Sequence, residues 1–223
     1  MFGFDKKELD ILKELNNPRR IQDFLNDLKI NFEPEGDTCM SPRRVLLEGR
    51  AHCMEGAMLA AAALRVNGFK PLVVDMTSNN KDFDHVVAVF KEGGYWGAIS
   101  KTNHAVLKYR DPIFKTIREL VMSYFSEYFL NNGKKTLRSY SNPVNLERFD
   151  KLNWMTSEKD IWFVPEYLAK VKHIQLLKRS QIKKLRLADP IEIETGRIIE
   201  WKFENGKIIR NKFKVDKEDK AEI

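Results

Sequence analysis

The chain has 223 residues, 43% of them hydrophobic and 32% charged, which is typical of a folded soluble protein with one good core. It has no run of 18 apolar residues that would predict a membrane span, and its start lacks the features of a secretory signal, so we expect a cytoplasmic protein. The net charge of +7 is mildly basic, and without an aromatic RNA-binding motif it favours a solvated surface over a nucleic-acid site.

Helices are predicted at the start of the chain. Apolar residues at Leu9, Ile11, Leu12 and Leu15 have the spacing of an amphipathic helix over residues 6–16. Asn17-Pro18 and Ser41-Pro42 are cap-plus-proline signals, and they predict helices over residues 18–28 and 42–47 with a loop between them.

The segment 53–66 is rich in alanine and other strong helix formers and ends at Asn67-Gly68, a helix stop. So much alanine implies that other elements pack closely around the helix. We therefore expect it to be the central helix of the core.

Three runs after this helix read as strands: 71–76, 85–90 and 95–100. The last two form a predicted hairpin around Lys91-Glu92-Gly93-Gly94. A turn centred on Glu92-Gly93 places His85 opposite Ser100, whereas a Gly93-Gly94 turn places it opposite Thr102. In either register, the polar partner of His85 should come from residues 100–103.

The rest of the chain predicts a long helix from Asp111-Pro112 to about residue 129 and a loop over 136–153, with a subdomain boundary near 145. A helix then starts near residue 157 and resumes over 167–177. A hairpin of 197–203 and 207–213 turns at Asn205-Gly206, before a charged tail. We thus divide the chain into a domain of residues 1–144 and an extension of residues 145–223.

Cys53 is the candidate nucleophile. It lies where the central helix begins, so backbone amides and the positive end of the helix dipole favour its thiolate, and the same amides are donors for an oxyanion. We expect Cys39, by contrast, to be a buried small residue, and both thiols to stay reduced.

A thiol nucleophile needs an imidazole to exchange its proton, and the chain has four histidines. His85 opens a strand and is the preferred base. His52 adjoins Cys53 and is expected to support it at most. His104 falls in a loop, and His173 in a basic helix expected to be exposed.

Several segments together resemble the core of the transglutaminase-like superfamily, which shares the papain-like fold. They are Arg50-Ala51-His52-Cys53, the alanine-rich helix with Leu64-Arg65-Val66-Asn67-Gly68, Asp84-His85-Val86, and Trp96-Gly97-Ala98-Ile99-Ser100. The resemblance covers about residues 41–103. It implies an α+β fold in which a central helix bearing Cys53 packs on an antiparallel sheet, with additional N-terminal helices and a C-terminal helix and hairpin extension. It also implies that Cys53 is the nucleophile and His85 the base.

The sequence departs from the family at the third position. The family has Asp there, whereas this chain has Ser100 followed by Lys101-Thr102-Asn103. Ser100 or Asn103 can orient an imidazole by a hydrogen bond but supplies no negative charge. Asn103 is the preferred substitute because papain-like enzymes use Asn in this role, and Asp84 and Asp111 are weaker candidates.

Three hypotheses for function follow. The leading one is thiol-dependent hydrolysis or acyl transfer on an amide or peptide bond, with a protein or peptide substrate, and hydrolysis is preferred on superfamily frequency. The second is a catalytically inactive interaction module that keeps the fold, since Ser100 replaces the acid. The third is nucleic-acid binding by the basic residues interleaved with apolar ones over 170–186.

No cofactor is expected, because the chain has no glycine-rich phosphate loop. A metal site is also not expected. Cys39, His52, Cys53 and His85 offer suitable ligand atoms, but no CxxC or HxxxH spacing occurs.

Overall fold

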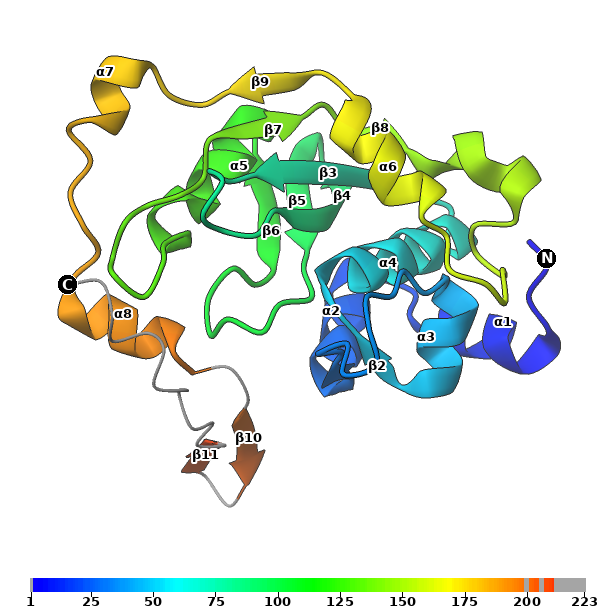
Figure 1. Cartoon of the computed structure of the whole chain (residues 1–223). Coiled ribbons are helices and arrows are strands. Elements are labelled where there is room, and N and C mark those ends of the chain that lie inside the picture. The colour runs from blue at the N-terminus through cyan, green and yellow to red at the C-terminus, as the bar shows by residue number, and fades with distance from the viewer. Residues whose placement is uncertain (1, 199–200, 205–206, 211–223) are drawn as a thin grey trace.

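The computed structural model describes residues 2–198 and the backbone of residues 201–204 and 207–210. Helices and strands are mixed along the chain, as Figure 1 shows. The helices are α1 (Lys6–Glu14), α2 (Pro18–Asp27), α3 (Pro42–Glu48), α4 (Cys53–Val66), α5 (Ile117–Tyr124), α6 (Phe163–Lys170), α7 (Arg179–Ile182) and α8 (Pro190–Gly196), with 3-10 helices η1 (Phe125–Glu127) and η2 (Leu146–Leu152). The strands are β1 (Lys29–Ile30), β2 (Arg50–Ala51), β3 (Leu72–Thr77), β4 (His85–Glu92), β5 (Tyr95–Ile99), β6 (Arg110–Phe114), β7 (Ser139–Ser141), β8 (Val144–Asn145), β9 (His173–Gln175), β10 (Trp201–Glu204) and β11 (Lys207–Arg210).

One antiparallel sheet organises the molecule. Its strands follow the order β6-β5-β4-β3-β7-β9, and β8 also pairs with β3. The β4–β5 hairpin therefore lies inside the sheet rather than at its edge. An antiparallel sheet covered by separately placed helices is an α+β arrangement, which confirms the predicted class at that level.

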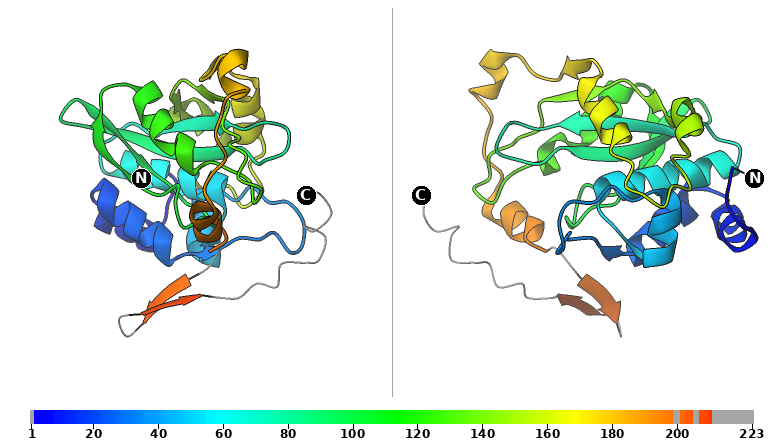
Figure 2. Two further views of the ribbon diagram at one scale, coloured as in Figure 1. Left: turned by 90° about the vertical axis from the view of Figure 1, so that its left-hand side faces the viewer. Right: turned by 45° about the vertical axis from the view of Figure 1, so that its right-hand side comes forward.

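The two faces of the sheet carry two hydrophobic clusters. On one face, alternate strand residues such as Val86 and Ala88 pack with helices α1 to α4 and α6. On the other face, the neighbouring residues Val87 and Val89 pack with α5. Figure 2 shows α1 to α4 on one side of the sheet and α5 on the other. This alternation follows from the two-residue repeat of a strand and produces the two layers of helices.

Helix α4 is the centre of the larger cluster. Every residue from Glu55 to Leu64 is buried, and the helix ends at Asn67 with Gly68 in a left-handed conformation. The predicted central helix is thus confirmed. The alanines allow α1, α2, α3 and the sheet to approach it closely, because each replaces a long side chain by a single methyl group.

The three N-terminal helices form where the capping residues predict them. Asp5, Asn17 and Ser41 each accept a hydrogen bond from a backbone amide in the first helical turn, at the starts of α1, α2 and α3. Helix α3 ends at Gly49, whose left-handed backbone turns the chain into β2 and then into α4. This tight connection fixes where α4 begins.

The β4–β5 hairpin turns at Gly93 and Gly94, the second of the two predicted registers. Glu92 pairs with Tyr95, and Ala88 pairs with Ile99. Both glycines have positive φ angles, 57° and 89°, which a two-residue turn of this kind requires. Continued in the same register, His85 faces Thr102, and Ser100 lies diagonally from His85 on the same face of the sheet.

The predicted long helix over residues 111–129 is wrong at its start. Residues Arg110–Phe114 form the edge strand β6, and helix α5 begins only after Thr116, whose side chain accepts from the amide of Glu119. An edge strand tolerates Pro112, because one side of its backbone needs no ladder partner. The Asp111-Pro112 pair was therefore a strand sequence that resembles a helix cap.

The C-terminal region also differs from the prediction. The segment 136–153, expected to be a loop, holds β7, β8 and η2, and β7 and β8 both pair with β3. Helix α6 takes Pro165 in its first turn, where no amide is needed, and the chain then returns to the sheet as β9, so His173 lies in a strand.

The predicted C-terminal hairpin forms as the antiparallel pair β10 and β11. Its turn, Asn205-Gly206, and the charged tail lie outside the described residues. None of the helices formed by the described part of the chain is long and apolar enough to cross a membrane.

The close packing of α4 can be tested at Gly56. A Cβ atom there would lie 2.3 Å from Cβ of Lys101, in the segment that follows β5. Alanine is the better helix former by about 1 kcal/mol, yet overpacking costs about 1–3 kcal/mol, so we expect Gly56→Ala to lower the free energy of unfolding. Urea denaturation measures it. An equal or higher stability would show that this segment is free to move away from α4.

Candidate active site

The site is built around the first turn of α4. Cys53 is the first residue of the helix and His52 is its N-cap. The backbone amides of this turn have no partners within the helix and carry the positive end of its dipole, so they favour a negative charge on the sulfur. The short pairing of β2 with β1 immediately before the helix holds this turn in place.

The thiol of Cys53 is strongly acidified. Burial by itself would raise its pKa, but hydrogen bonds with His52 and His85 outweigh burial and lower the pKa of Cys53 to about 5. At neutral pH this residue is therefore a thiolate, the nucleophilic form. Cys39 is buried, is not part of a disulfide, and bonds to the carbonyl of Ile161; burial raises its pKa to about 12.

His52, which the sequence analysis expected to play a supporting role at most, makes hydrogen bonds through both ring nitrogens. Its Nε2 atom lies 3.0 Å from the carbonyl oxygen of Thr38 and therefore donates to it, while Nδ1 lies 3.2 Å from the backbone nitrogen of Met54. In the neutral ring Nδ1 accepts from that amide. Once protonated, Nδ1 donates instead, and the sulfur of Cys53 is an acceptor in reach.

The protonated form of His52 is favoured. Burial works against the charged ring, but the hydrogen bond with Cys53 and the carboxylate of Glu55 raise the pKa of His52 to about 9. Oε1 of Glu55 lies 3.4 Å from Nε2 of His52. The Cys53 thiolate and the buried carboxylate of Glu55 thus both favour a positive charge on His52.

Glu55 joins the start of α4 to the preceding loop through hydrogen bonds. Its side chain is fully buried and accepts from the backbone amides of His52 and Met40, the hydroxyl of Thr38 and the amide of Asn31. The first of these contacts is a capping box across the start of α4. The carboxylate therefore fixes the loop over residues 31–40 against the helix start.

His85 lies at the start of β4, is buried, and hydrogen bonds with Cys53. Its Nε2 atom lies 2.9 Å from Oγ of Ser100. The Ser100 hydroxyl donates its one proton to the carbonyl oxygen of Leu107, at 2.7 Å, so it accepts from His85. This pattern puts the proton on Nε2 and leaves Nδ1 as the basic nitrogen.

Ser100 is itself positioned from two sides. The buried side chain of Gln22 on α2 accepts from the amide of Ser100 and donates to its carbonyl, both at 2.9 Å. The carbonyl that receives the Ser100 hydroxyl belongs to Leu107, which has a φ of +59°. That strained conformation is held by Glu127, whose carboxylate accepts from the Leu107 amide and pairs with Arg110.

The structure brings Cys53, His85 and Ser100 together, and it separates the other candidates from the His85 ring. Asn103 is exposed on the loop after β5 and lines the cavity beside Cys53, but Ser100 takes the bond to His85. Asp84 accepts from Ser78 on the loop before β4. Asp111 is exposed in β6 and lines neither cavity.

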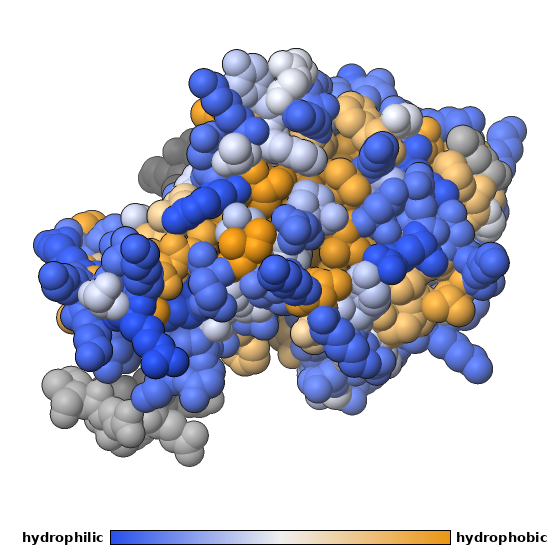
Figure 3. All heavy atoms as spheres, turned by 90° about the horizontal axis from the view of Figure 1, so that it is seen from above, coloured by the Kyte–Doolittle hydropathy of each residue, from blue (hydrophilic) through white to orange (hydrophobic). Residues whose placement is uncertain are grey.

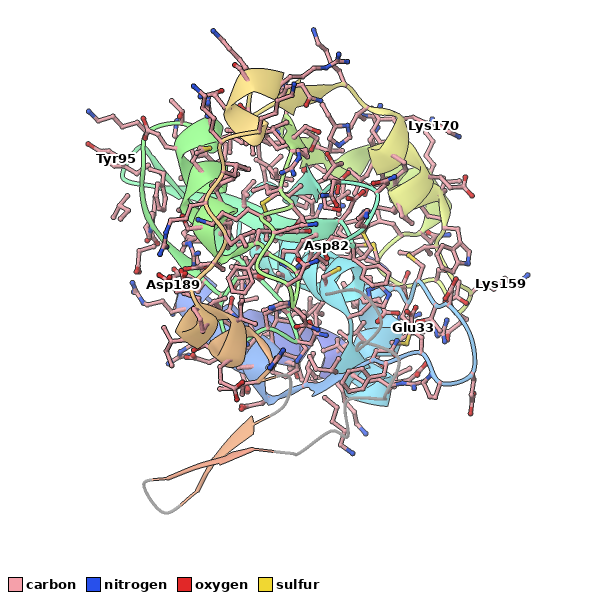
Figure 4. The ribbon with its side chains drawn as sticks, turned by 60° about the vertical axis from the view of Figure 1, so that its left-hand side comes forward. Glu33, Asp82, Tyr95, Lys159, Lys170 and Asp189 are labelled. Carbon is pink, nitrogen blue, oxygen red and sulfur yellow. The ribbon has the colours of Figure 1, made fainter. Side chains whose placement is uncertain are left out.

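Two cavities meet at Cys53. The first measures about 440 Å³ and lies between α4, the loop before β4 and the loop after β5. Its wall includes Glu33 and Asp82; in Figure 4 Asp82 lies near the start of α4 at the centre, and Glu33 lies below and to the right. The second measures about 470 Å³ and lies between α4, β3, α6 and β9. Cys53, His52 and Asp84 line both.

Two histidines that the sequence analysis set aside, His104 and His173, line the cavities at Cys53. His173 on β9 bonds to the buried carboxylate of Asp75 on β3 at 3.0 Å and lines the second cavity. His104 lines the first cavity. Its buried Nδ1 has no hydrogen-bond partner among the described residues, and burial lowers its pKa. No sequence signal pointed to the His173–Asp75 pair, because the two residues are 98 positions apart.

No group of three or more His, Cys, Asp or Glu side chains among the described residues is arranged to hold a metal ion. The sequence matches no model of a known protein family, and a search of the curated proteins also finds no match. The geometry around Cys53 therefore carries the functional argument.

The acidity of Cys53 can be measured by alkylation with iodoacetamide across pH. The rate should follow a pKa of about 5 and stay level above it, because the thiolate is the reactive form and is present above its pKa. His52→Asn keeps a good N-cap without the imidazole, and His85→Ala removes the other ring. Each should move the titration toward the ordinary thiol value of about 8.5.

Mass spectrometry identifies the labelled cysteine, and Cys53→Ala is the control, since the buried Cys39 should not react in the folded protein. A wild-type titration near the ordinary thiol value, unchanged in both histidine variants, would contradict this description of the site.

Proposed function

We propose that this protein is a thiol-dependent enzyme of the papain and transglutaminase type, which hydrolyses or transfers the acyl group of an amide or peptide bond. The observation that carries the proposal is a chain of hydrogen bonds from Cys53 to His85 and from His85 to Ser100. Cys53 lies at a helix start and lines two cavities. The α+β arrangement, with a cysteine-bearing helix packed on an antiparallel sheet, supports it.

In the proposed reaction, the proton of Cys53 passes to Nδ1 of His85, and the thiolate sulfur attacks the carbonyl carbon of the substrate. The backbone amides in the first turn of α4 are the nearest donors for the resulting oxyanion. His85 then delivers a proton from Nδ1 to the leaving nitrogen, the C–N bond breaks, and a thioester remains on Cys53. Water or an amine attacks the thioester and loses its proton to Nδ1 of His85, and the C–S bond breaks, which releases the acyl product and frees the Cys53 thiolate.

Ser100 orients His85 without stabilising its charge. The Ser100 hydroxyl keeps the Nε2 proton in place, as a carboxylate does in related sites, but it is neutral. The positive charge beside the sulfur is instead supported on the other ring, where His52 faces Glu55. We propose that His52 stabilises the thiolate while His85 moves the proton.

The second hypothesis is a non-catalytic interaction module, and the neutral Ser100 is the observation in its favour. The face of the molecule that carries α6 and β9 shows hydrophobic side chains as patches separated by hydrophilic ones (Figure 3). That face gives no broad apolar surface on which a partner would dock. The acidified thiol of Cys53 is not needed by a module that only binds, so we favour the enzyme.

The third hypothesis, nucleic-acid binding, is less well supported by the structure than by the sequence pattern. The basic segment 170–186 is not one amphipathic helix, because it contains β9 and the four residues of α7. Its apolar residues are also used inside the protein, since Leu176 is buried in the cluster beneath α5.

An acyl-enzyme test addresses the proposal directly. We expect 4-nitrophenyl acetate to release a burst of nitrophenol and to leave an acetyl group on Cys53, seen as a mass increase of the peptide that contains it. His85→Ala should slow the burst about 100-fold, because it removes the base, and Ser100→Ala should slow it about 10-fold, because the ring loses its orientation.

Cys39→Ala should leave the burst unchanged, which makes it the matched control for a lost thiol. If Cys53 of the folded protein is alkylated by iodoacetamide with a low pKa but is never acylated, the interaction module becomes the better description.

A further inference from the structure

The two cavities that meet at Cys53 have different walls. His52, Cys53 and Asp84 line both of them, whereas His85 lines only the first. The first cavity also takes its wall from the loops around residues 30–33 and 101–107. The second takes its wall from β3 and from the C-terminal segments α6 and β9. The catalytic pair is therefore not symmetric between the two spaces.

Because His85 lines only the first cavity, the leaving group and the acyl group of a substrate are expected in different cavities. In the proposed reaction, His85 gives its proton to the leaving nitrogen, so that nitrogen must lie between the sulfur of Cys53 and the His85 ring. The leaving group then extends into the first cavity. The acyl group is bonded to the sulfur on its other side, where the second cavity is open.

We propose that the second cavity receives the acyl group of the substrate, and that this group carries an aliphatic side chain with a positively charged end. The proposal rests on the function proposed above and adds a substrate class to it. It also gives the C-terminal segment a role, because α6 and β9 supply one wall of the acyl site.

The apolar part of the wall fits an aliphatic chain. Val86 on β4 and Met54 on α4 line this cavity, as do three residues of α6: Pro165, Leu168 and Ala169. Figures 1 and 2 show α6 beside β3 and over α4, and Leu168 belongs to the same buried cluster as α4. A methylene chain placed between these side chains loses contact with water on both sides.

Most of the polar groups of the wall are already paired. Thr77 and Ser139 hydrogen bond to each other through their hydroxyls. His173 lies between two acceptors, with Nδ1 at 2.9 Å from the carbonyl of Val171 and Nε2 at 3.0 Å from Asp75. Both ring nitrogens face an acceptor, so the two contacts need two protons. A neutral imidazole ring supplies only one. The His173–Asp75 pair therefore holds one additional proton and has no net charge.

Asp84 is the remaining charge. Its carboxylate accepts from the amide and hydroxyl of Ser78, which are neutral donors. His52 and Cys53 form opposite charges, and His52 faces Glu55 in addition. The described side chains that line the second cavity therefore leave one negative charge at its edge, and a cationic end group complements it.

Esters with one leaving group and different acyl groups test this assignment. The probes are the 4-nitrophenyl esters of N-acetyl-lysine, of N-acetyl-norleucine, which has a similar chain without the charge, and of N-acetyl-glutamate. We expect acylation of Cys53 by the lysine ester to be about fivefold faster than by the norleucine ester, the factor of a partly exposed ion pair, with the glutamate ester slowest. Asp84→Asn should remove the preference for lysine over norleucine.

Ala169→Trp tests the location. Ala169 is exposed on α6, so a larger side chain is tolerated by the fold, and it lines the second cavity. Acylation by the lysine ester should fall about tenfold, while 4-nitrophenyl acetate, which has no side chain, should react within about twofold of wild type. Glu166→Trp, an exposed position of the same helix that lines neither cavity, is the matched control and should change neither rate.

The outcomes are distinguishable. Equal rates for the lysine and norleucine esters in the wild type would overturn the charge preference. A loss of acyl discrimination in Asn103→Trp, at the first cavity, with none in Ala169→Trp would overturn the assignment of the cavities. Failure of every ester, including the acetate, to acylate Cys53 would instead overturn the proposed function and the acyl site with it.

Discussion

The buried carboxylate of Glu55 is the interaction on which the site depends. It lies in the first turn of α4, is fully buried, and accepts hydrogen bonds from the helix start and from the loop over residues 31–40. A buried carboxylate is tolerated only when it is well paired, and here each pairing fixes part of the Cys53 environment. The same carboxylate supports the charge of His52, so folding and thiol chemistry share one group.

The hydrogen-bond partner of His85 is a neutral hydroxyl, that of Ser100, and not a carboxylate. The neutral Ser100 holds the proton of His85 through a hydroxyl whose own proton goes to the carbonyl of Leu107. In a conventional triad, one carboxylate both orients the histidine and stabilises its positive charge. Here one histidine is oriented, and the charge of the other is stabilised, by two different side chains. Ser100 orients His85, and Cys53 together with Glu55 favours the charged form of His52. The positive φ of Leu107 is held by Glu127, whose carboxylate accepts from the Leu107 amide.

Part of this fold and site was predictable from the sequence, and the successes and errors have physical causes. The alanine-rich helix, its start at Cys53 and its stop at Asn67-Gly68 depend on local signals, and they were predicted correctly. The helix over residues 111–129 was wrong at its start because Asp111-Pro112 suits both a helix cap and an edge strand, and only the neighbour β5 decides between them. β9 was missed because its partner β7 lies more than 30 residues earlier.

The sequence by itself identified Cys53 as the candidate nucleophile, His85 as the preferred candidate base, and the short segment from which His85 takes its hydrogen-bond partner. Helix starts, strand ends and hairpin lengths are local properties of the chain. Only the tertiary structure decided that Ser100 rather than Asn103 bonds to His85. It also decided that His52 interacts with the Cys53 thiolate, and that α6 and β9 line a second cavity at Cys53. Each of these contacts depends on the packing of separate segments, since hydrogen-bond partners are selected by distance in space and not by distance along the chain.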